Sequence, residues 1–575
     1  MKLFALEWMP VGMGGCEDVR RKGMLRSAGR GLAAGWLAIG AMLTLVGCDK
    51  SGDAPASPPT SVANPPVAQT AAFQILATSD LRDAEPLAAM VQKATGVAVK
   101  FTFGGTMEST EAVQTGSTQA DAAWFANAKY LLSDPQGQAR VKLQEKIMLS
   151  PIVVGVSESQ ARLLGWDNPQ AKVTWTTVAQ AASAGKLKFA LSNPATSNQG
   201  FMALMGVVAS AAGKSEALTV TDIRRDAISG FIKGYKLPGD NSSYLSEQFI
   251  AQQGTRVNAF INYESWLLSL NQSGKLREKL KLVYPHEGVA TADYPLMLLN
   301  DARRADYQKV VAYLKGAEAQ TWLARTTLRR PANPEVAQAQ AGLFPQGSVL
   351  VELPFSTDRA LADGLIEAYL NEFRTPIAST FVLDVSGSMN GNGRRQQLVQ
   401  ALQYIAGEDA SLTGRIARLT SREKVWMLTF STQVNEPVFF QLPKASDKPE
   451  AKQQVLANVR DYADNLRMTG GTALYDAVLQ ALTTMNTERQ KNPNYQYSVV
   501  AFTDGEVNKG RDLTQFKADY AQLPEDVKAI PVFMVLFGEA NEAALKDLVA
   551  TTGGRVFDAR TASLYSVFKD IRAYQ

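Results

Sequence analysis

From Phe73 onward, apolar stretches alternate with amphipathic ones in a regular order. The apolar run "FQILATS" (73–79) predicts a strand, and "LRDAEPLAAMVQKATG" (81–96) has the period of a helix that ends at Gly96. The run "VAVKFTFGGT" (97–106) then predicts a second strand. A strand, a helix and a strand in this order indicate a parallel α/β unit, and the pattern continues to about residue 355.

A second α/β alternation begins at Thr380. Before it, "STDRALADGLIEAYLNEFR" (356–374) predicts a helix with Ser356 or Thr357 as its N-cap, and we expect a domain boundary near this helix. The predicted strands after it are "TFVLDVS" (380–386), "KVWMLTFS" (424–431), "YSVVAFTD" (497–504) and "PVFMVLFG" (531–538). Three of them are almost continuously apolar, which is typical of central parallel strands covered on both faces.

The amino terminus has the pattern of an export signal. The basic stretch "VRRKGMLRSAGR" precedes an uncharged apolar run over 31–47, as in a signal peptide. The run ends in Leu45-Val46-Gly47-Cys48, which resembles the lipobox of bacterial lipoproteins, in which the cysteine is lipidated. The alternative is a plain transmembrane anchor, although 17 residues is short for a bilayer. Residues 49–72 are rich in Pro, Ser and Ala and predict an extended tether.

Composition narrows the choice of function. The net charge is +4 over 575 residues, and residues 1–47 contribute +3 of it, so the remaining chain is almost neutral and gives no basis for nucleic-acid binding. Cys16 and Cys48 are the two cysteines of the sequence. If Cys48 is lipidated, the mature chain has no internal disulfide.

Oxygen-bearing side chains follow the predicted strands of the second segment. The candidate metal ligands are Asp384, Ser386, Ser388, Thr472 and Asp504. Ligands of an open parallel sheet gather at the carboxyl ends of its strands, where these residues stand. Carboxylates and hydroxyls without Cys or His suit a hard cation such as Mg²⁺. Gly387 permits the tight turn that would fold the two serines around one ion.

The order D-x-S-x-S, T-G-G-T and T-D-G over 375–575 resembles the von Willebrand factor A (VWA) domain and its metal-ion-dependent adhesion site. The resemblance implies that Ser386, Ser388 and Thr472 bind Mg²⁺ (or Mn²⁺ or Ca²⁺) through their hydroxyls. It also implies that Asp384 and Asp504 bind the ion directly or through water. One coordination position then remains for an acidic side chain of a protein partner.

These residues also have other interpretations. Asp384 and Asp504 could be structural caps of strand ends. A phosphatase with an aspartate nucleophile needs a second acid where Ser386 stands, and a serine hydrolase lacks its flanking glycines and a nearby histidine. Arg394 and Arg395, after the metal loop, could pair with an acidic partner, or simply form a solvated helix start.

The first segment has three polar loops before predicted helices. They are Thr78-Ser79-Asp80, Gly104-Gly105-Thr106 and Thr196-Ser197-Asn198. Helix starts attract anions through free N–H groups and the helix dipole, so converging loops would form a site for an anion or polar solute. The alternative for each loop is an ordinary N-cap.

Pieces spread over 73–355, among them "ILATSDL", "VKFTFGGT", "LSNPATSNQGFMALMG", "VNAFINYES" and "LRRPANP", resemble type II solute-binding proteins of ABC transporters. The resemblance implies a cleft lined by Ser79, Gly105, Thr106, Thr196, Ser197 and Tyr263. Glu264 is a further possible cleft residue, and its charge would repel an anion. Trp124 and Trp266 could stack on a ligand or pack in the core.

Together these patterns predict an α/β protein in which a two-lobed solute-binding domain precedes a doubly wound VWA domain with a mainly parallel sheet. The expected boundaries are 1–47 signal peptide, 48–72 lipidated Cys48 and tether, 73–355 solute-binding domain, 356–374 linker helix and 375–575 VWA domain. We expect a non-enzymatic binding or adaptor protein, anchored by lipid on the periplasmic side of a membrane, with the inner membrane as the candidate. Its expected partners are an acidic protein group at the metal and a small solute or anion in the cleft. The alternative is an ABC-transporter component, and a Mg²⁺-dependent hydrolase ranks below it.

Overall fold

The computed structural model describes residues 71–574, apart from 215–216, 240–241, 346–351, 354–357, 506, 538–541 and 561–563. The predicted signal peptide, Cys48 and nearly all of the tether lie outside the described residues. Among the described helices, none is both long and apolar enough to cross a membrane.

The first lobe is built on a five-stranded sheet in the order β2-β1-β3-β11-β4. These strands are β1 (Phe73–Thr78), β2 (Val99–Gly104), β3 (Ala122–Trp124), β4 (Leu143–Lys146) and β11 (Pro295–Leu298). β1 pairs in parallel with β2, as the sequence predicts. The predicted intervening helix is split into a 3-10 helix (Ser79–Ala84) and α1 (Leu87–Thr95), because Pro86 cannot donate a backbone hydrogen bond inside a helix. Gly96 closes α1 at a φ of 75°, in the left-handed region.

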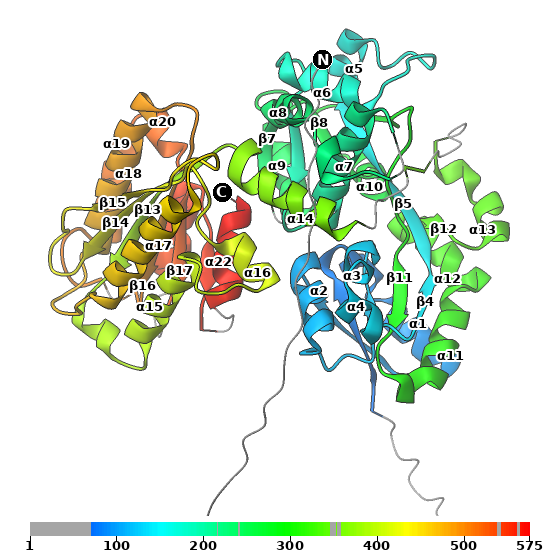
Figure 1. Ribbon diagram of the computed structural model, residues 1–575, viewed down its shortest axis with the longest axis horizontal. Helices are drawn as coiled ribbons and strands as arrows, with labels where there is room; N and C mark the ends of the chain where they lie inside the picture. Colours follow the sequence, from blue (N-terminus) through cyan, green and yellow to red (C-terminus); the bar gives the residue numbers. More distant parts are fainter. Residues whose placement is uncertain are drawn as a thin grey trace, which may run out of the picture. The chain divides into compact units, whose positions relative to one another are not determined.

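The second lobe contains a seven-stranded sheet whose main order is β10-β5-β8-β6-β7. Its strands are β5 (Met148–Ser157), β6 (Phe189–Ser192), β7 (Tyr235–Gly239), β8 (Ala259–Tyr263), β9 (Leu280–Val283), β10 (Thr291–Ala292) and β12 (Arg330–Pro331). The chain enters this sheet between β4 and β5 and returns to the first between β10 and β11 (Figure 1). Two lobes joined by crossing segments confirm the predicted two-lobed architecture.

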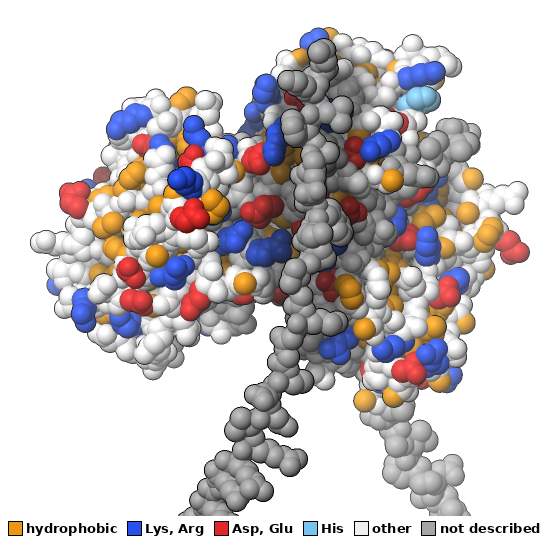
Figure 2. Space-filling view, viewed as in Figure 1, with side chains coloured by type: hydrophobic (Ala, Val, Ile, Leu, Met, Phe, Trp, Pro, Cys, Tyr) orange, Lys and Arg blue, Asp and Glu red, His pale blue; other side chains and the backbone are white. Residues whose placement is uncertain are grey.

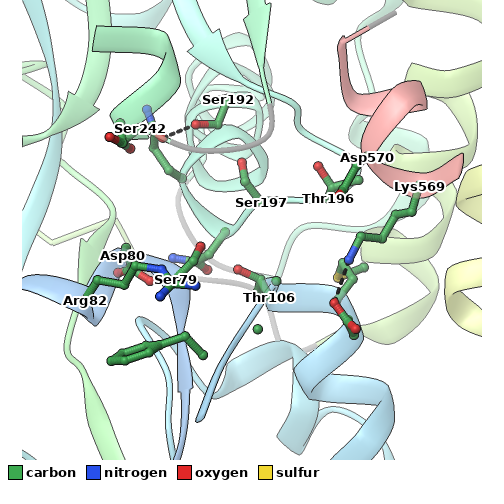
Figure 3. A pocket seen from close by; sticks show the side chains of 18 of the residues that line it. Ser79, Asp80, Arg82, Thr106, Ser192, Thr196, Ser197, Ser242, Lys569 and Asp570 are labelled. Carbon is green, nitrogen blue, oxygen red and sulfur yellow. Dashed lines mark hydrogen bonds and ion pairs between the residues drawn. The ribbon is translucent and has the colours of Figure 1, made fainter. Parts of the chain in front are cut away.

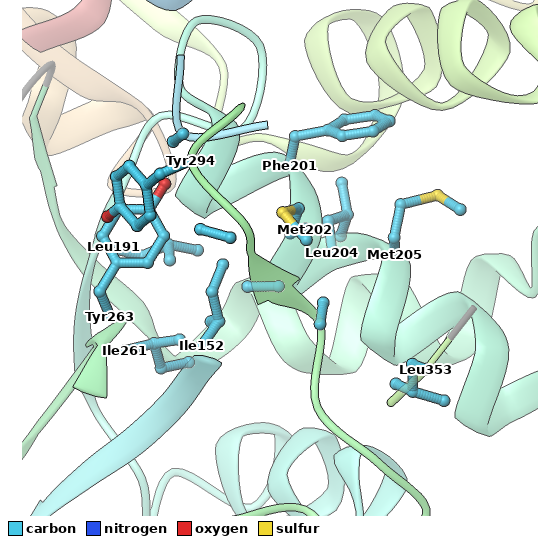
Figure 4. Packing of buried hydrophobic residues seen from close by; sticks show 14 of the residues in the cluster. Ile152, Leu191, Phe201, Met202, Leu204, Met205, Ile261, Tyr263, Tyr294 and Leu353 are labelled. Carbon is cyan, nitrogen blue, oxygen red and sulfur yellow. The ribbon is translucent and has the colours of Figure 1, made fainter. Parts of the chain in front are cut away.

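Helices pack around both lobes. They are α2 (Thr106–Thr115), α3 (Lys129–Leu132), α4 (Pro135–Arg140), α5 (Glu158–Leu164), α6 (Trp175–Ser183), α7 (Asn198–Ala212), α8 (Arg225–Gly234), α9 (Ser242–Gln252), α10 (Glu264–Gln272), α11 (Arg304–Leu314), α12 (Ala317–Trp322) and α13 (Pro334–Ala339). α7 is buried along most of its length, since apolar side chains occupy several of its faces. Figure 4 shows its Met202 and Leu204 close to Ile152 and Ile261 of the central strands.

The helix predicted over 356–374 is α14 (Arg359–Ala368), which continues as one π-helical turn over Tyr369–Phe373. Its N-cap is Asp358, whose carboxylate accepts hydrogen bonds from the backbone N–H groups of Ala360 and Leu361. The predicted caps Ser356 and Thr357 are therefore wrong, and both lie outside the described residues. Aspartate caps a helix as well as serine does, so capping preference alone could not distinguish Asp358 from the two predicted residues.

The carboxy-terminal segment is a six-stranded sheet in the order β15-β14-β13-β16-β17-β18. The strands are β13 (Ile377–Asp384), β14 (Lys424–Phe430), β15 (Val438–Gln441), β16 (Gln496–Thr503), β17 (Val532–Leu536) and β18 (Val556–Asp558). All pairs are parallel except β14 with β15, which confirms the mainly parallel sheet. The sequence missed β15, an edge strand with exposed Val438 and Phe439, and β18, which has three residues.

Both faces of this sheet are covered by helices. Along β13, Phe381 and Leu383 join one apolar cluster, whereas Ala378 and Val382 join another on the opposite face. The helices of this segment are α15 (Arg394–Ile405), α16 (Leu412–Ala417), α17 (Pro449–Asp464), α18 (Leu474–Lys491), α19 (Leu513–Gln522), α20 (Glu525–Lys528), α21 (Glu542–Thr552) and α22 (Leu564–Tyr574). This doubly wound arrangement explains why its central strands are continuously apolar.

Acidic and basic side chains alternate over the face shown in Figure 2. Neither sign dominates that face, which agrees with the nearly neutral composition beyond residue 47. The overall electrostatic field of the protein therefore does not indicate a function, and the local sites have to do so.

Candidate metal centre and solute cleft

The two acids of the predicted metal site meet at one edge of the carboxy-terminal sheet. Asp384 is the last residue of β13, and Asp504 directly follows β16. The two strands are parallel neighbours, with Leu383 opposite Phe502. Their carboxyl ends therefore coincide, and both aspartates are buried at that edge, at 0% and 1% exposure.

Backbone hydrogen bonds hold the three polar loops together. The Gly387 N–H donates to the Gly470 carbonyl oxygen at 3.0 Å, and the Thr469 N–H donates to that of Val385 at 2.7 Å. On the other side, the Thr472 N–H donates to the Asn508 side-chain oxygen at 3.0 Å. Thr472, 1% exposed, is thus fixed between the loops that carry the serines and Asp504.

The oxygen spacing fits an octahedral cation. The hydroxyl oxygens of Ser386 and Ser388 lie 3.0 Å apart. Adjacent ligands of an octahedral Mg²⁺ at about 2.0–2.1 Å are also about 3 Å apart, since they subtend a right angle. Within the described residues, no group of three or more His, Cys, Asp or Glu could hold a metal, so hydroxyl oxygens have to complete any such site.

Asp384 is held in place through both of its oxygens. Oδ1 accepts the Ser386 N–H at 2.9 Å, and Oδ2 accepts the Thr503 hydroxyl at 2.7 Å. Burial raises the pKa of Asp384 to about 6, against hydrogen bonds from Ser386 and Thr503 that lower it. A nearby cation would favour the ionised form. Thr503, part of the T-D-G motif, is a supporting residue that the sequence interpretation missed.

Asp504 has an ion pair that the sequence did not predict. Its Oδ2 accepts from Nη1 of Arg394 at 2.8 Å, and the same guanidinium lies 3.3 Å from the Ser388 carbonyl oxygen. Its Oδ1 is buried and has no hydrogen-bond partner among the described residues. Arg394 is therefore not a solvated helix start. Arg395 instead donates to the backbone carbonyls of Asp464 and Leu466.

The six residues predicted for the solute cleft line one cavity of about 660 Å³. They are Ser79, Gly105, Thr106, Thr196, Ser197 and Tyr263. The cavity size suits a small ligand. Figure 3 shows Ser79, Thr106, Thr196 and Ser197 around the same space.

Two helices begin at this cavity. Gly105 is the N-cap of α2, and Ser197 caps α7 by accepting the Gly200 N–H at 3.0 Å. Hence the N-cap interpretation is also correct for Ser197, and it does not exclude a role in the cleft. The Thr196 hydroxyl and Oδ2 of Asp80 are buried without a hydrogen-bond partner among the described residues. Burial raises the pKa of Asp80, against the lowering effect of Arg329.

Glu264 and Trp124 do not line this cavity. Glu264 is fully buried and forms a bidentate ion pair with Arg330, with N–O distances of 2.6 and 2.7 Å. The expectation that its charge would repel an anion in the cleft is therefore wrong, because Arg330 neutralises it. Trp124 is a core residue at 0% exposure, whereas Trp266 does line the cavity.

The sequence also missed several lining residues. From the two lobes these include Arg82, Ser192 and Ser242, and from the carboxy-terminal segment they include Lys569 and Asp570. Polar residues at the end of a strand and at the start of a helix could have indicated Ser192 and Ser242. No local signal could have indicated Lys569, which lies more than 460 residues from Gly105 in the sequence.

Comparison with known families agrees with both halves of this architecture. The family model for bacterial extracellular solute-binding proteins matches residues 74–328. The model for the von Willebrand factor type A domain matches residues 380–570. The chain therefore combines a solute-binding domain with a VWA domain that follows it.

Individual relatives are distant. The human inter-alpha-trypsin inhibitor heavy chain H4 is 26% identical over 252 residues, which is 41% of this chain and 25% of that protein, so the chain spans about a quarter of its length. The periplasmic binding protein AfuA from Actinobacillus pleuropneumoniae has a TM-score of 0.42 and 14% identity, covering 52% of this chain and 98% of that one. A ferric binding protein from Campylobacter jejuni has a TM-score of 0.39 and 11% identity, covering 52% and 96%.

Proposed function

We propose that this protein is an extracytoplasmic binding adaptor that captures an acidic group of a partner protein through a divalent metal in its VWA domain. Asp384, Ser386, Ser388, Thr472 and Asp504 would hold the ion. Mg²⁺ bound there, or Mn²⁺ or Ca²⁺, would supply a cationic ligand position for the partner's carboxylate. The proposed role is binding rather than catalysis, because the candidate site offers no nucleophile or general base beyond its metal ligands.

The observation that carries this proposal is an oxygen of Asp504 that is buried without a hydrogen-bond partner among the described residues, at the sheet edge where two serine hydroxyls stand at cation-ligand spacing. A carboxylate oxygen buried without a partner is costly, and a metal ion would satisfy it. The loop hydrogen bonds position these ligands in advance, which lowers the conformational cost of binding the ion.

The cleft supports a second binding role within the same protein. Six hydroxyl, glycine and tyrosine residues surround a cavity of about 660 Å³, and two helices begin at it. We assign to it a small polar or anionic solute. A lipid on Cys48 would attach both domains to a membrane on its periplasmic side. The alternative, a substrate-binding component of an ABC transporter, would use the same cleft and add a permease as partner.

The test is a pull-down from detergent-solubilised membranes of the source cell. Full-length native protein and Asp384→Ala serve as baits, each in Mg²⁺ and in EDTA, with mass spectrometry of the captured proteins. A partner retained only by the native bait in Mg²⁺ is the expected result. A permease among such partners would favour the transport role.

The matched control is Asp519→Ala, which removes an exposed acid of the same domain that pairs with Arg511. Its pull-down should equal that of the native protein in both buffers. Equal capture by all baits in Mg²⁺ and in EDTA would contradict metal-dependent adhesion.

A further inference from the structure

The carboxy-terminal helix α22 of the VWA domain contributes side chains to the solute cleft. Lys569 lines the cavity, and its Nζ forms an ion pair with Oε2 of Glu108 in the first turn of α2 at 2.7 Å (Figure 3). The Lys569 side chain is only 10% exposed, so its ammonium group is held in the cleft wall rather than in bulk water.

The backbone of α2 leaves room for this lysine. A Cβ atom added to Gly105, the N-cap of α2, would lie 3.2 Å from the Lys569 Nζ. Such a contact is tighter than ordinary packing, so a residue without a side chain allows the close approach. The ammonium group therefore lies beside the start of α2, where backbone N–H groups already favour negative charge.

A second contact ties the same helix to the VWA domain. Glu111, one turn after Glu108, accepts the Leu412 N–H at 3.0 Å and the Thr413 hydroxyl at the start of α16. α16 packs on α22, and α22 also packs on β7 of the second lobe. Helix α2, which forms one wall of the cleft, is thus bound to α22 through Glu108 and to α16 through Glu111.

We propose that the cleft is a composite site in which Lys569 of the VWA domain binds the anionic group of a small hydroxylated solute. The inference rests on the solute-binding role proposed for the cleft. Hydroxyl groups of the lobes, such as those of Ser79, Thr106 and Ser242, would bind the solute's hydroxyls. Lys569 and the start of α2 together would bind its phosphate or carboxylate.

Glu108 acts as the internal counterion of Lys569 when no solute is bound. An incoming anion competes with Glu108 for the ammonium group, so the strength of this ion pair opposes solute binding. Removing Lys569 and removing Glu108 should therefore have opposite effects on solute affinity. A purely structural ion pair would instead make both substitutions equally harmful.

The test measures binding to the full-length protein by isothermal titration calorimetry. The probes are glucose 6-phosphate and gluconate, with glucose as the uncharged counterpart. We expect at least one charged probe to bind more tightly than glucose. Lys569→Met should weaken that binding at least tenfold, Lys569→Arg should largely retain it, and Glu108→Gln should strengthen it severalfold. Lys546→Met, which removes an exposed lysine of α21, is the control and should change nothing.

Unchanged affinity in Lys569→Met would overturn the composite site, and so would equal weakening in Lys569→Met and Glu108→Gln. Binding of glucose but of neither charged probe would overturn the proposal that the solute is anionic. It would leave the proposed solute-binding role of the cleft intact. Binding of none of the three probes would count against both this inference and the cleft's proposed role. Circular dichroism of each variant establishes that a loss of binding does not come from unfolding.

Discussion

At the scale of single residues, Asp504 is the most informative side chain of the candidate metal site. One of its oxygens accepts from Arg394 at 2.8 Å, and the other is buried without a partner among the described residues. Arg394 therefore fixes the orientation of a predicted metal ligand, as supporting residues around metals commonly do. Its positive charge also stands next to the position that a divalent cation would take.

Arg394→Gln separates these two effects, because glutamine can still donate a hydrogen bond to Asp504 but carries no charge. Two unit charges about 4 Å apart repel by about 1 kcal/mol in water and about 4 kcal/mol near a protein surface, and a divalent ion doubles this. We expect Arg394→Gln to bind Mn²⁺ about tenfold more tightly, measured by electron paramagnetic resonance titration. Arg395→Gln is the control, since the Arg395 guanidinium donates to the backbone carbonyls of Asp464 and Leu466 rather than to Asp504. Weaker binding by Arg394→Gln would mean that orientation outweighs charge.

At the scale of elements, the start of α7 depends on a close approach to β6. A Cβ atom at Gly200 would lie 2.1 Å from the carbonyl oxygen of Ser192, a backbone atom that cannot move aside easily. Because Ser197 caps this helix and Thr196 precedes it, the spacing between α7 and β6 sets the position of two predicted cleft residues.

Gly200→Ala should therefore push the start of α7 away from the strand. We expect the free energy of unfolding to fall by about 2–3 kcal/mol, as in other overpacked cores, measured by urea denaturation. Gly342→Ala is the control, since nothing lies within 4 Å of a Cβ at that position. Equal free energies of unfolding for the two variants would show that the backbone at the end of β6 shifts with little loss of stability.

At the scale of the whole molecule, a buried charge cluster joins three distant parts of the sequence. Glu423, 1% exposed, accepts from Arg374 at 2.5 Å, just after the π-helical turn that follows α14, and from Arg572 in α22. Burial alone would raise the pKa of Glu423, but Arg572 and Arg374 outweigh it and hold the pKa below its usual value. The cluster stabilises the folded chain while Glu423 is ionised.

Glu423→Gln should leave two buried guanidinium groups without their counterion, at a cost of about 3–5 kcal/mol in the free energy of unfolding. A lowered carboxyl pKa gives stability that is complete above about pH 4.5, the ordinary value, and is lost as the pH falls further. Thermal melts from pH 3 to pH 7 should therefore show that the melting temperature of the native protein exceeds that of Glu423→Gln by less below that pH than above it. Glu436→Gln, at an exposed site, should match the native protein. If the two melting temperatures differed by the same amount at every pH, the ionised form of Glu423 would not be the cause of the difference.

The sequence by itself determined the features that depend on neighbours along the chain. The D-x-S-x-S turn follows from an apolar strand that ends in Asp384, and the helix starts at Gly105 and Ser197 follow from local capping chemistry. Continuous apolar strands likewise indicated a sheet covered on both faces. The short strand β18 and the exposed edge strand β15 were not predicted, because neither has an apolar pattern long enough to indicate a strand.

Only the tertiary structure decided which charges meet. Glu264 is neutralised by Arg330, Asp504 by Arg394 and Glu108 by Lys569, and these partners are separated by 66, 110 and 461 positions. Residue spacing cannot reveal such pairs, because folding brings them together through the packing of whole sheets and helices. For the same reason the sequence indicated a cleft between two lobes but not the lysine that the VWA domain places in its wall.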